Sequence, residues 1–204
     1  IIYEERRRVL DGESMRDAVY NMLSDFVAAT VNRFTSTETP KADWDIEGLN
    51  RELDASLELT PVSADEVETS SQAELVELLQ ERAANAYADK EAEFEEEEIR
   101  EVERVVLLKA IDRRWMDHID DMDQLRQGIG LQSYGQKNPL VEYKMLGYDM
   151  FGEMTEGISA DTVRMLMHVR VEKKVEREEV AKVTGTNKDE SLARAPKKRE
   201  DKKV

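Results

Sequence analysis

The sequence predicts an all-α protein, and three observations support this fold class. The 204 residues include only nine Gly and four Pro, the residue types that most often interrupt helices. Charged residues make up 37% of the chain, above the roughly 25% of an average globular domain. Apolar residues recur at steps of three and four, which places them on one helical face. The predicted architecture is a long αα-hairpin with a small helical subdomain and a disordered tail.

The first residues predict the end of one helix and the start of another. Residues 1–11 have the pattern of the last turns of a helix that begins before this sequence, ended near Gly12. Ser14 then offers an N-cap, with an acid three residues later. After it, apolar side chains keep a helical spacing as far as Phe34. We therefore expect a helix over residues 14–34.

Two further helices complete the predicted subdomain. A short helix marked by apolar residues from Trp44 to Leu57 is expected to stop before Pro61, because the residue that precedes a proline avoids helical geometry. A loop is predicted as far as Ser70. Ser71 begins a capping-box pattern that favours a third helix. The three helices predict a small acidic subdomain over residues 12–95.

A long helix and a return helix are the next elements. Apolar spacing continues without Gly or Pro over residues 96–127, which predicts a helix of about 48 Å. Gly128 and Gly130 are expected to end it, because glycine tolerates the left-handed conformation common at helix ends. Asn138 supplies a cap and Pro139 the first residue of the return helix. Together they predict an αα-hairpin with a short loop.

The end of the chain predicts a break, a last helix and a tail. Gly157 is expected to interrupt the return helix, and a further helix is predicted over residues 160–182. Residues 170–204 hold 12 basic and 8 acidic side chains, so a mildly basic tail follows an acidic body. From Gly185 onward there is almost nothing to bury, which is typical of disorder.

Composition excludes several classes of function. The 30 basic and 46 acidic residues give a net charge of −16, which argues against nucleic-acid binding because phosphates attract dense Lys and Arg. The sequence has no cysteine, so it offers neither disulfides nor thiol catalysis nor cysteine zinc sites. It has no phosphate-binding loop and no dinucleotide-binding glycine motif, so no cofactor is expected in this chain. No apolar run approaches the roughly 20 residues that cross a bilayer.

Catalytic residues and metal ligands are not expected either. His118 and His168 do not belong to a zinc-binding pattern. The acidic run over residues 117–123 lacks the glycine and the terminal glutamate of a calcium loop. We interpret this run, and the one over residues 95–98, as solvated or partner-facing surface. No residue is therefore assigned to catalysis or to a metal.

The predicted hairpin loop is the first candidate for a contact with a partner. Leu131, Tyr134, Gln136 and Lys137 lie between the loop glycines and Pro139, at the end of a long strut where an aromatic side chain could be presented. The alternative is that Tyr134 folds back onto its own hairpin. Spacing alone leaves both interpretations open.

The methionines and the basic tail are two weaker candidates. Flexible thioethers suit surfaces that repack against varied partners, although core filling is the favoured interpretation. Seven of the nine methionines lie in the second half of the chain: Met116, Met122, Met145, Met150, Met154, Met165 and Met167. The basic run over residues 197–199 could contact anionic lipid, but acidic neighbours favour a solvated linker.

An ordered series of motifs between residues 105 and 154 closely resembles the SecA family, the motor ATPases of the bacterial Sec preprotein translocase. The resemblance extends over about residues 1–175, more loosely over 40–90. The matching segments are Trp115 to His118, Met122 to Ile129, Tyr134 to Pro139, Glu142 to Lys144, and Met150 to Phe151, together with the opening residues Ile2 to Leu10. So long a series in one order is specific.

The resemblance implies a division of the chain into named parts. Residues 1–11 correspond to the end of the long scaffold helix, and residues 12–95 to the helical wing. Residues 96–172 correspond to the rest of the helical scaffold, of which 96–157 form the two-helix finger. Residues 173–204 correspond to the C-terminal linker, largely disordered. The fold implied is the same all-α hairpin that the apolar spacing predicts.

The resemblance also implies partners and a location. In the family, the finger loop reaches the SecYEG channel and the moving preprotein, with a tyrosine at the position of Tyr134, and the finger restrains ATP hydrolysis. ATP and magnesium bind in motor domains that these residues do not include, so this chain is expected to be a fragment without ATPase activity of its own. The expected location is the cytoplasm, at the inner face of the bacterial membrane.

Some implications stay open at the level of sequence. Many family members end in a cysteine-rich zinc-binding tail that engages SecB, and this cysteine-free chain does not support that role. Self-association and contact with anionic lipid remain open. The alternative function is a helical adaptor that binds partner helices through its methionine-bearing faces and has no link to transport.

Overall fold

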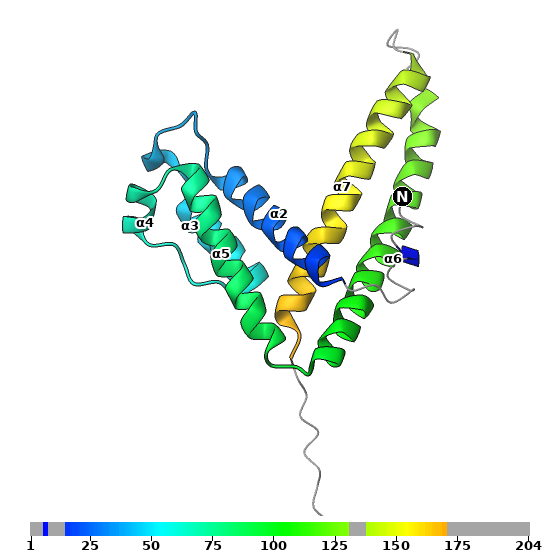
Figure 1. Cartoon of the computed structure of the whole chain (residues 1–204). Helices are drawn as coiled ribbons and strands as arrows, with labels where there is room; N and C mark the ends of the chain where they lie inside the picture. Colours follow the sequence, from blue (N-terminus) through cyan, green and yellow to red (C-terminus); the bar gives the residue numbers. More distant parts are fainter. Residues whose placement is uncertain (1–5, 8–14, 131–137, 171–204) are drawn as a thin grey trace, which may run out of the picture. The chain divides into compact units, whose positions relative to one another are not determined.

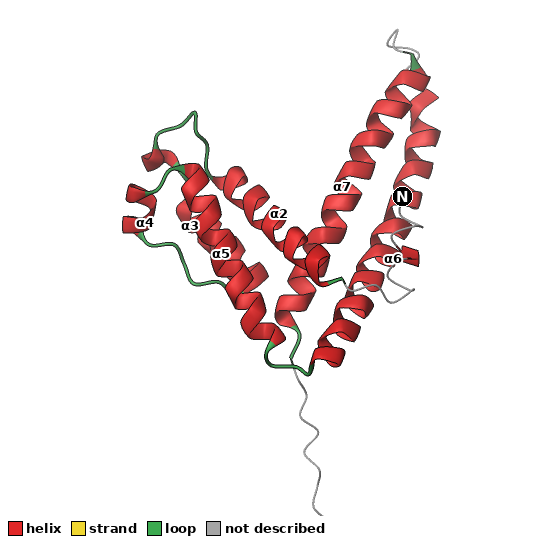
Figure 2. Ribbon diagram, in the orientation of Figure 1, coloured by secondary structure: helices red, strands yellow, loops and turns green. Residues whose placement is uncertain are grey.

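The computed structural model describes residues 6–7, 15–130 and 138–170, and the regular structure within these ranges is helical, so the predicted all-α class is confirmed (Figures 1 and 2). The predicted tail lies outside the described residues. The elements are α2 (Arg16–Phe34), η1 (Lys41–Asp43), α3 (Ile46–Leu57), α4 (Ala64–Thr69), α5 (Gln72–Glu91), α6 (Glu96–Gly128) and α7 (Pro139–His168). We call α2 to α5 the N-terminal subdomain, and α6 with α7 the hairpin.

Helices α2 and α3 end where the sequence predicts. α2 stops at Phe34, and the Thr35 hydroxyl donates to the Val31 carbonyl at 2.7 Å. α3 stops at Leu57, and Glu58 after it takes the left-handed conformation with φ 54°. The expected cap residue Ser14 lies outside the described residues.

The loop predicted between Pro61 and Ser70 is wrong, because α4 forms within it. Ser63 and Glu66 make a full capping box, in which the Ser63 amide donates to Glu66 at 2.8 Å. Buried Val67 fixes this short helix against the core. The S-x-x-E pattern was present in the sequence, and the expectation of a loop overlooked it. The capping box predicted at Ser71 is confirmed.

One apolar core fills the N-terminal subdomain and continues into the last turns of α7. Seven of its side chains have no exposed surface: Val27, Val31, Leu49, Leu57, Leu75, Leu79 and Ala83. Val163, Leu166 and Met167 of α7 belong to the same cluster. The end of the hairpin is therefore part of the subdomain core.

The hairpin consists of two long helices that run side by side (Figure 1). α6 has 33 residues and α7 has 30, so the predicted break at Gly157 is wrong and the predicted last helix is a continuation of α7. An added Cβ at Gly157 would stand 3.0 Å from the Arg114 guanidinium carbon. That guanidinium donates to both carboxylate oxygens of Asp161, at 2.7 and 2.9 Å. Gly157 therefore permits a close approach of α6.

A smaller core joins the two helices of the hairpin near their middle. Its buried members are Met15, Leu107, Ala110, Ile111, Met154 and Ile158. None of them lies beyond Ile111 on α6 or before Met154 on α7. The part of α7 predicted for residues 160–182 ends as a helix at His168, and residues from 171 onward lie outside the described ranges.

Candidate functional site

The far end of the hairpin contains no buried residue among those that the structure describes. We call residues 112–128 of α6 and 139–153 of α7 the distal arm. The nearest buried side chains are Ile111 and Met154, at its base. From Ile111 to the end of α6 the arm measures about 26 Å, at about 1.5 Å per residue.

Large apolar side chains are exposed along this arm. The exposed fraction reaches 79% for Tyr148 and 61% for Leu140. Val141, Met145 and Tyr148 are spaced by four and three residues, so they share one face of α7. Met116 and Ile119 are exposed on α6. Apart from Val105, the large exposed apolar residues of the described chain all lie on the distal arm.

The residues expected to shape the tip, Gly128, Gly130, Asn138 and Pro139, all lie within the described ranges. The Asn138 side chain caps α7 by accepting from the Leu140 amide at 3.0 Å, and Pro139 is the first helical residue. Gly128 still lies within α6, and Ile129 after it has φ −63° and ψ −26°, a right-handed conformation. α6 therefore ends within one residue of the predicted position, but its end is right-handed, so the left-handed conformation predicted there is wrong.

The four residues predicted to contact a partner lie in a segment that the structure does not describe. These residues are Leu131, Tyr134, Gln136 and Lys137, and Gly130 immediately precedes the segment. The described helices on either side reach the tip of the arm, because α6 ends at Gly128 and α7 begins at Pro139.

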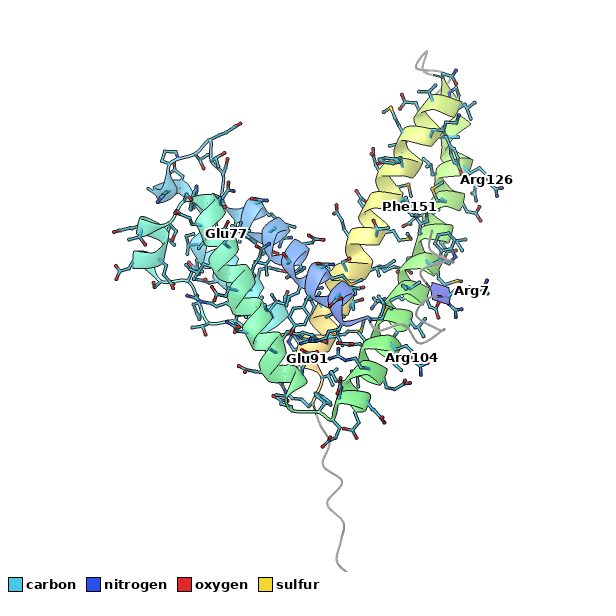
Figure 3. All side chains as sticks on the ribbon, viewed as in Figure 1. Arg7, Glu77, Glu91, Arg104, Arg126 and Phe151 are labelled. Carbon is cyan, nitrogen blue, oxygen red and sulfur yellow. The ribbon has the colours of Figure 1, made fainter. Side chains whose placement is uncertain are left out.

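Aromatic side chains line the middle of the arm. The His118 ring lies 5.8 Å from Trp115 and 6.0 Å from Phe151, measured between ring centroids. Phe151 is labelled on α7 in Figure 3. A small cavity of about 140 Å³ beside His118 is lined by Arg114, Asp117, Asp121, Met150, Glu153 and Met154. Within the described ranges, no group of three or more acidic or histidine side chains is arranged to hold a metal ion.

A polar network lies at the opposite end of α6, where it meets the subdomain. The carboxylate of Glu91, the last residue of α5, accepts from Arg16 at 3.0 Å, from the Tyr20 hydroxyl at 2.8 Å, and from Arg100 of α6 (Figure 3). Partial burial works to raise the pKa of Glu91, but hydrogen bonds from the two arginines and the tyrosine outweigh it and lower the pKa to about 2. Glu91 is therefore held ionised.

Glu103 is the second carboxylate of this network, and its side chain is fully buried. One oxygen accepts from the Tyr87 hydroxyl at 2.7 Å and from Arg100. The other oxygen has no hydrogen-bond partner among the described residues. Burial, followed by the bond to Glu103, raises the pKa of Tyr87, so its hydroxyl stays a donor.

Sequence reasoning missed this network, although one signal was available. Ile99, Glu103, Leu107 and Ala110 share the buried face of α6, so a glutamate occupies a position where the spacing calls for an apolar residue. Charge in an apolar register indicates a buried partner. The nearby acidic run over residues 95–98 was interpreted as solvated or partner-facing surface, and Glu103 was not considered separately from it.

A groove of about 760 Å³ lies between α2 and α7. Its walls include Asp25, Phe26, Arg33, Glu52, Glu153, Glu156 and Arg164. Arg164 crosses it, with its guanidinium 3.3 Å from the Ser56 hydroxyl and 3.4 Å from Glu52 of α3. Near the end of α7, Arg170 donates to Glu58 at 2.6 Å. These contacts bind α7 to the subdomain beside the apolar core.

Among the described helices, none combines the length and the apolar character needed to span a bilayer. The geometry thus consists of a packed subdomain, a hairpin rooted in it, and an arm with exposed apolar faces.

Comparison with known proteins identifies the family. A family model described as SecA Wing and Scaffold domain matches residues 1–170. The protein translocase subunit SecA of Lachnoclostridium phytofermentans is 56% identical over 207 residues, covering 100% of this chain and 24% of that protein. The subunit of the same name from Clostridium botulinum strain Loch Maree is 44% identical and covers 98% of this chain. That from Alkaliphilus oremlandii is 43% identical and covers 96%.

The chain spans about a quarter of the length of these curated relatives. The family match nevertheless extends over every described helix, from the subdomain through the distal arm. The resemblance read from the motifs is therefore confirmed, and the chain belongs to the SecA family, within its wing and scaffold region.

Proposed function

We propose that this chain is the wing, scaffold and two-helix finger of a preprotein translocase subunit, and that the finger loop contacts the moving polypeptide. The proposal rests on one observation, the exposure of apolar side chains along the distal arm. Its exposed apolar side chains flank the loop over residues 131–137. An unfolded polypeptide varies in sequence, so its contact surface has to be apolar and adaptable. The names of the relatives support the same role.

The parts of the chain take different tasks in this proposal. Tyr134 is the aromatic contact, and Leu131, Gln136 and Lys137 complete the loop surface toward preprotein and the SecYEG channel. Motor domains elsewhere in the translocase subunit bind ATP and magnesium, and the scaffold regulates their hydrolysis. The subunit works at the cytoplasmic face of the membrane without crossing it.

Site-specific crosslinking tests the loop contact. A photoreactive residue at position 134 of the full-length translocase subunit is irradiated while a preprotein is arrested in the channel. Crosslinks to preprotein or SecY are expected at 134 and absent at Glu77, which is exposed on α5 (Figure 3). Continued translocation without a crosslink at 134 would show that the tip faces elsewhere.

Substitution of Tyr134 gives the matching functional prediction. Tyr134→Ser removes an aromatic contact worth about 1–2 kcal/mol and is expected to lower translocation roughly tenfold, with a smaller effect on ATP hydrolysis. Tyr134→Phe keeps the ring and should retain most of the activity. Equal losses in translocation and hydrolysis after Tyr134→Ser would contradict the contact role.

A helical adaptor is the second candidate, and two exposed methionines favour it. Met116 and Met145 are 60% and 56% exposed, whereas Met154 and Met167 are buried in the cores. An adaptor would lose partner binding when Met116 and Met145 are replaced by serine, and would tolerate Tyr134→Ser. The translocase proposal expects the opposite ranking.

A further inference from the structure

The two helices of the hairpin are rooted in the subdomain by different chemistry. α7 ends in the apolar core, through Val163, Leu166 and Met167. α6 begins with the polar network around Arg100, and its apolar contacts with the same core are the half-buried Val102 and Val106. An apolar core holds its members without regard to direction, whereas hydrogen bonds fix a geometry.

The network spans the connection between α5 and α6 at two levels. Residues 92–95 join the helices. The pair nearer to this connection is Glu91 with Arg100, and the pair farther from it is Tyr87 with Glu103. Arg100 donates to both carboxylates and so links the two levels.

Because these two pairs lie at different distances from the connection over residues 92–95, together they fix the angle between α5 and α6. Glu103 lies about 12 Å along α6 from the end of the connection, at about 1.5 Å per residue. A rotation of α6 by roughly 20° would displace it by about 4 Å. That displacement exceeds the range of a hydrogen bond, so the network is either formed or broken and does not stretch.

Burial of Glu103 indicates a role in positioning more than in stability. A buried carboxylate with one unbonded oxygen stabilises a fold less than an apolar side chain of similar size would. Buried charged groups can instead fix a single arrangement. The neighbouring positions on this face of α6 are apolar, so Glu103 stands out within its own register.

We propose that Tyr87, Glu91, Arg100 and Glu103 form a clasp that sets the position of α6 against the subdomain, with Arg100 as its positioning residue. When the clasp opens, the base of α6 moves while α7 stays fixed by the core. The clasp thereby sets the direction in which the base of α6 leaves the subdomain. The clasp is inferred from the contacts of these four side chains and does not rest on the function proposed for the loop.

Distance measurement between spin labels tests the clasp in the 204-residue chain. The chain has no cysteine, so paired cysteine substitutions give specific labelling. E77C with E98C reports on the base of α6, and E77C with D149C reports on α7; all three positions are exposed. R100Q is expected to broaden the 77–98 distance distribution roughly twofold and to leave the 77–149 distribution unchanged.

Two further variants complete the test. R104Q is the matched control, because Arg104 pairs with Glu101 within α6 and makes no ion pair with the described residues of the subdomain (Figure 3). R100K keeps the charge but lacks the fork that bonds two carboxylates, so partial broadening is expected. If R100Q loses its helical circular dichroism, Y87F, which removes one hydroxyl, replaces it, with a smaller broadening expected.

The outcomes separate the clasp from its rivals. An unchanged 77–98 distribution in folded R100Q, or in Y87F where R100Q unfolds, would overturn the proposal. Equal broadening of both pairs would also overturn it, because the hairpin would then move as one body. The measurement needs no translocation partner, so its result is independent of the function proposed for the loop.

Discussion

The N-terminal subdomain and the distal arm use the same kind of helix in opposite ways. The subdomain buries its apolar residues almost completely, and Leu49, Leu75 and Leu79 have no exposed surface. The arm buries none of its described residues and leaves Met145 and Tyr148 mostly exposed. Stability is therefore concentrated in the subdomain, and the arm is a surface that the subdomain and hairpin base support.

Two matched substitutions, one in the subdomain core and one on the arm, test this difference most directly. Leu79→Ala empties space in a sealed core and is expected to lower the free energy of unfolding by about 2–5 kcal/mol. Met145→Ala removes an exposed side chain and should change it by less than about 0.5 kcal/mol. Urea denaturation followed by circular dichroism measures both. Similar losses would mean that the arm contributes to the core.

The pH dependence of stability tests the polar network where the subdomain meets the hairpin. The pKa of Glu91, lowered to about 2, lies below that of an ordinary carboxylate, so its interactions stabilise the fold above about pH 4.3. This contribution, on the order of 2–3 kcal/mol, should be lost as the pH falls from there toward 2. Denaturation of the native chain and of Glu91→Gln at pH 7 and pH 3 measures it. An equal pH dependence in the variant would contradict the assignment.

Two glycines give the smallest and most local test. A Cβ at Gly48 would stand 2.3 Å from one carboxylate oxygen of Asp45, whose other oxygen caps α3, and 2.8 Å from the Phe34 ring, so Gly48→Ala should destabilise by about 1–2 kcal/mol. A Cβ at Gly152, in the arm, would meet nothing within 4 Å, so Gly152→Ala should stabilise by up to about 1 kcal/mol. Thermal unfolding of both variants is the measurement. Stabilisation by Gly48→Ala would show that the cap can move aside.

Local spacing and capping patterns predicted most of the helices. The apolar rhythm and the Ser71 box identified α2, α5 and the hairpin helices, because these signals lie within a few residues of each other. The break predicted at Gly157 was wrong because this glycine makes room for the guanidinium of Arg114, which lies on another helix. A glycine that makes room for a neighbour and a glycine that ends a helix look alike in sequence.

The candidate site was predictable only in part, for the same reason. The residues of the loop tip were identified from motifs, and their contacts stay predictions. The clasp joins Arg100 and Glu103 of α6 to Tyr87 and Glu91 of α5, and Glu91 also accepts from Arg16 beside it. Such pairings follow from tertiary packing that periodicity does not specify. Glu103 in an apolar register was the one local sign of it.

The unbroken length of α7 turns a small displacement into a larger one. Its contacts with the hairpin core at Met154 and Ile158 divide it into two parts of unequal length. Met167 in the subdomain lies about 13 Å from Ile158, and Pro139 at the tip lies about 28 Å from it, at about 1.5 Å per residue. A tilt that shifts the subdomain end by about 1 Å therefore shifts the tip by about 2 Å, and a helix broken at Gly157 would lose this gain.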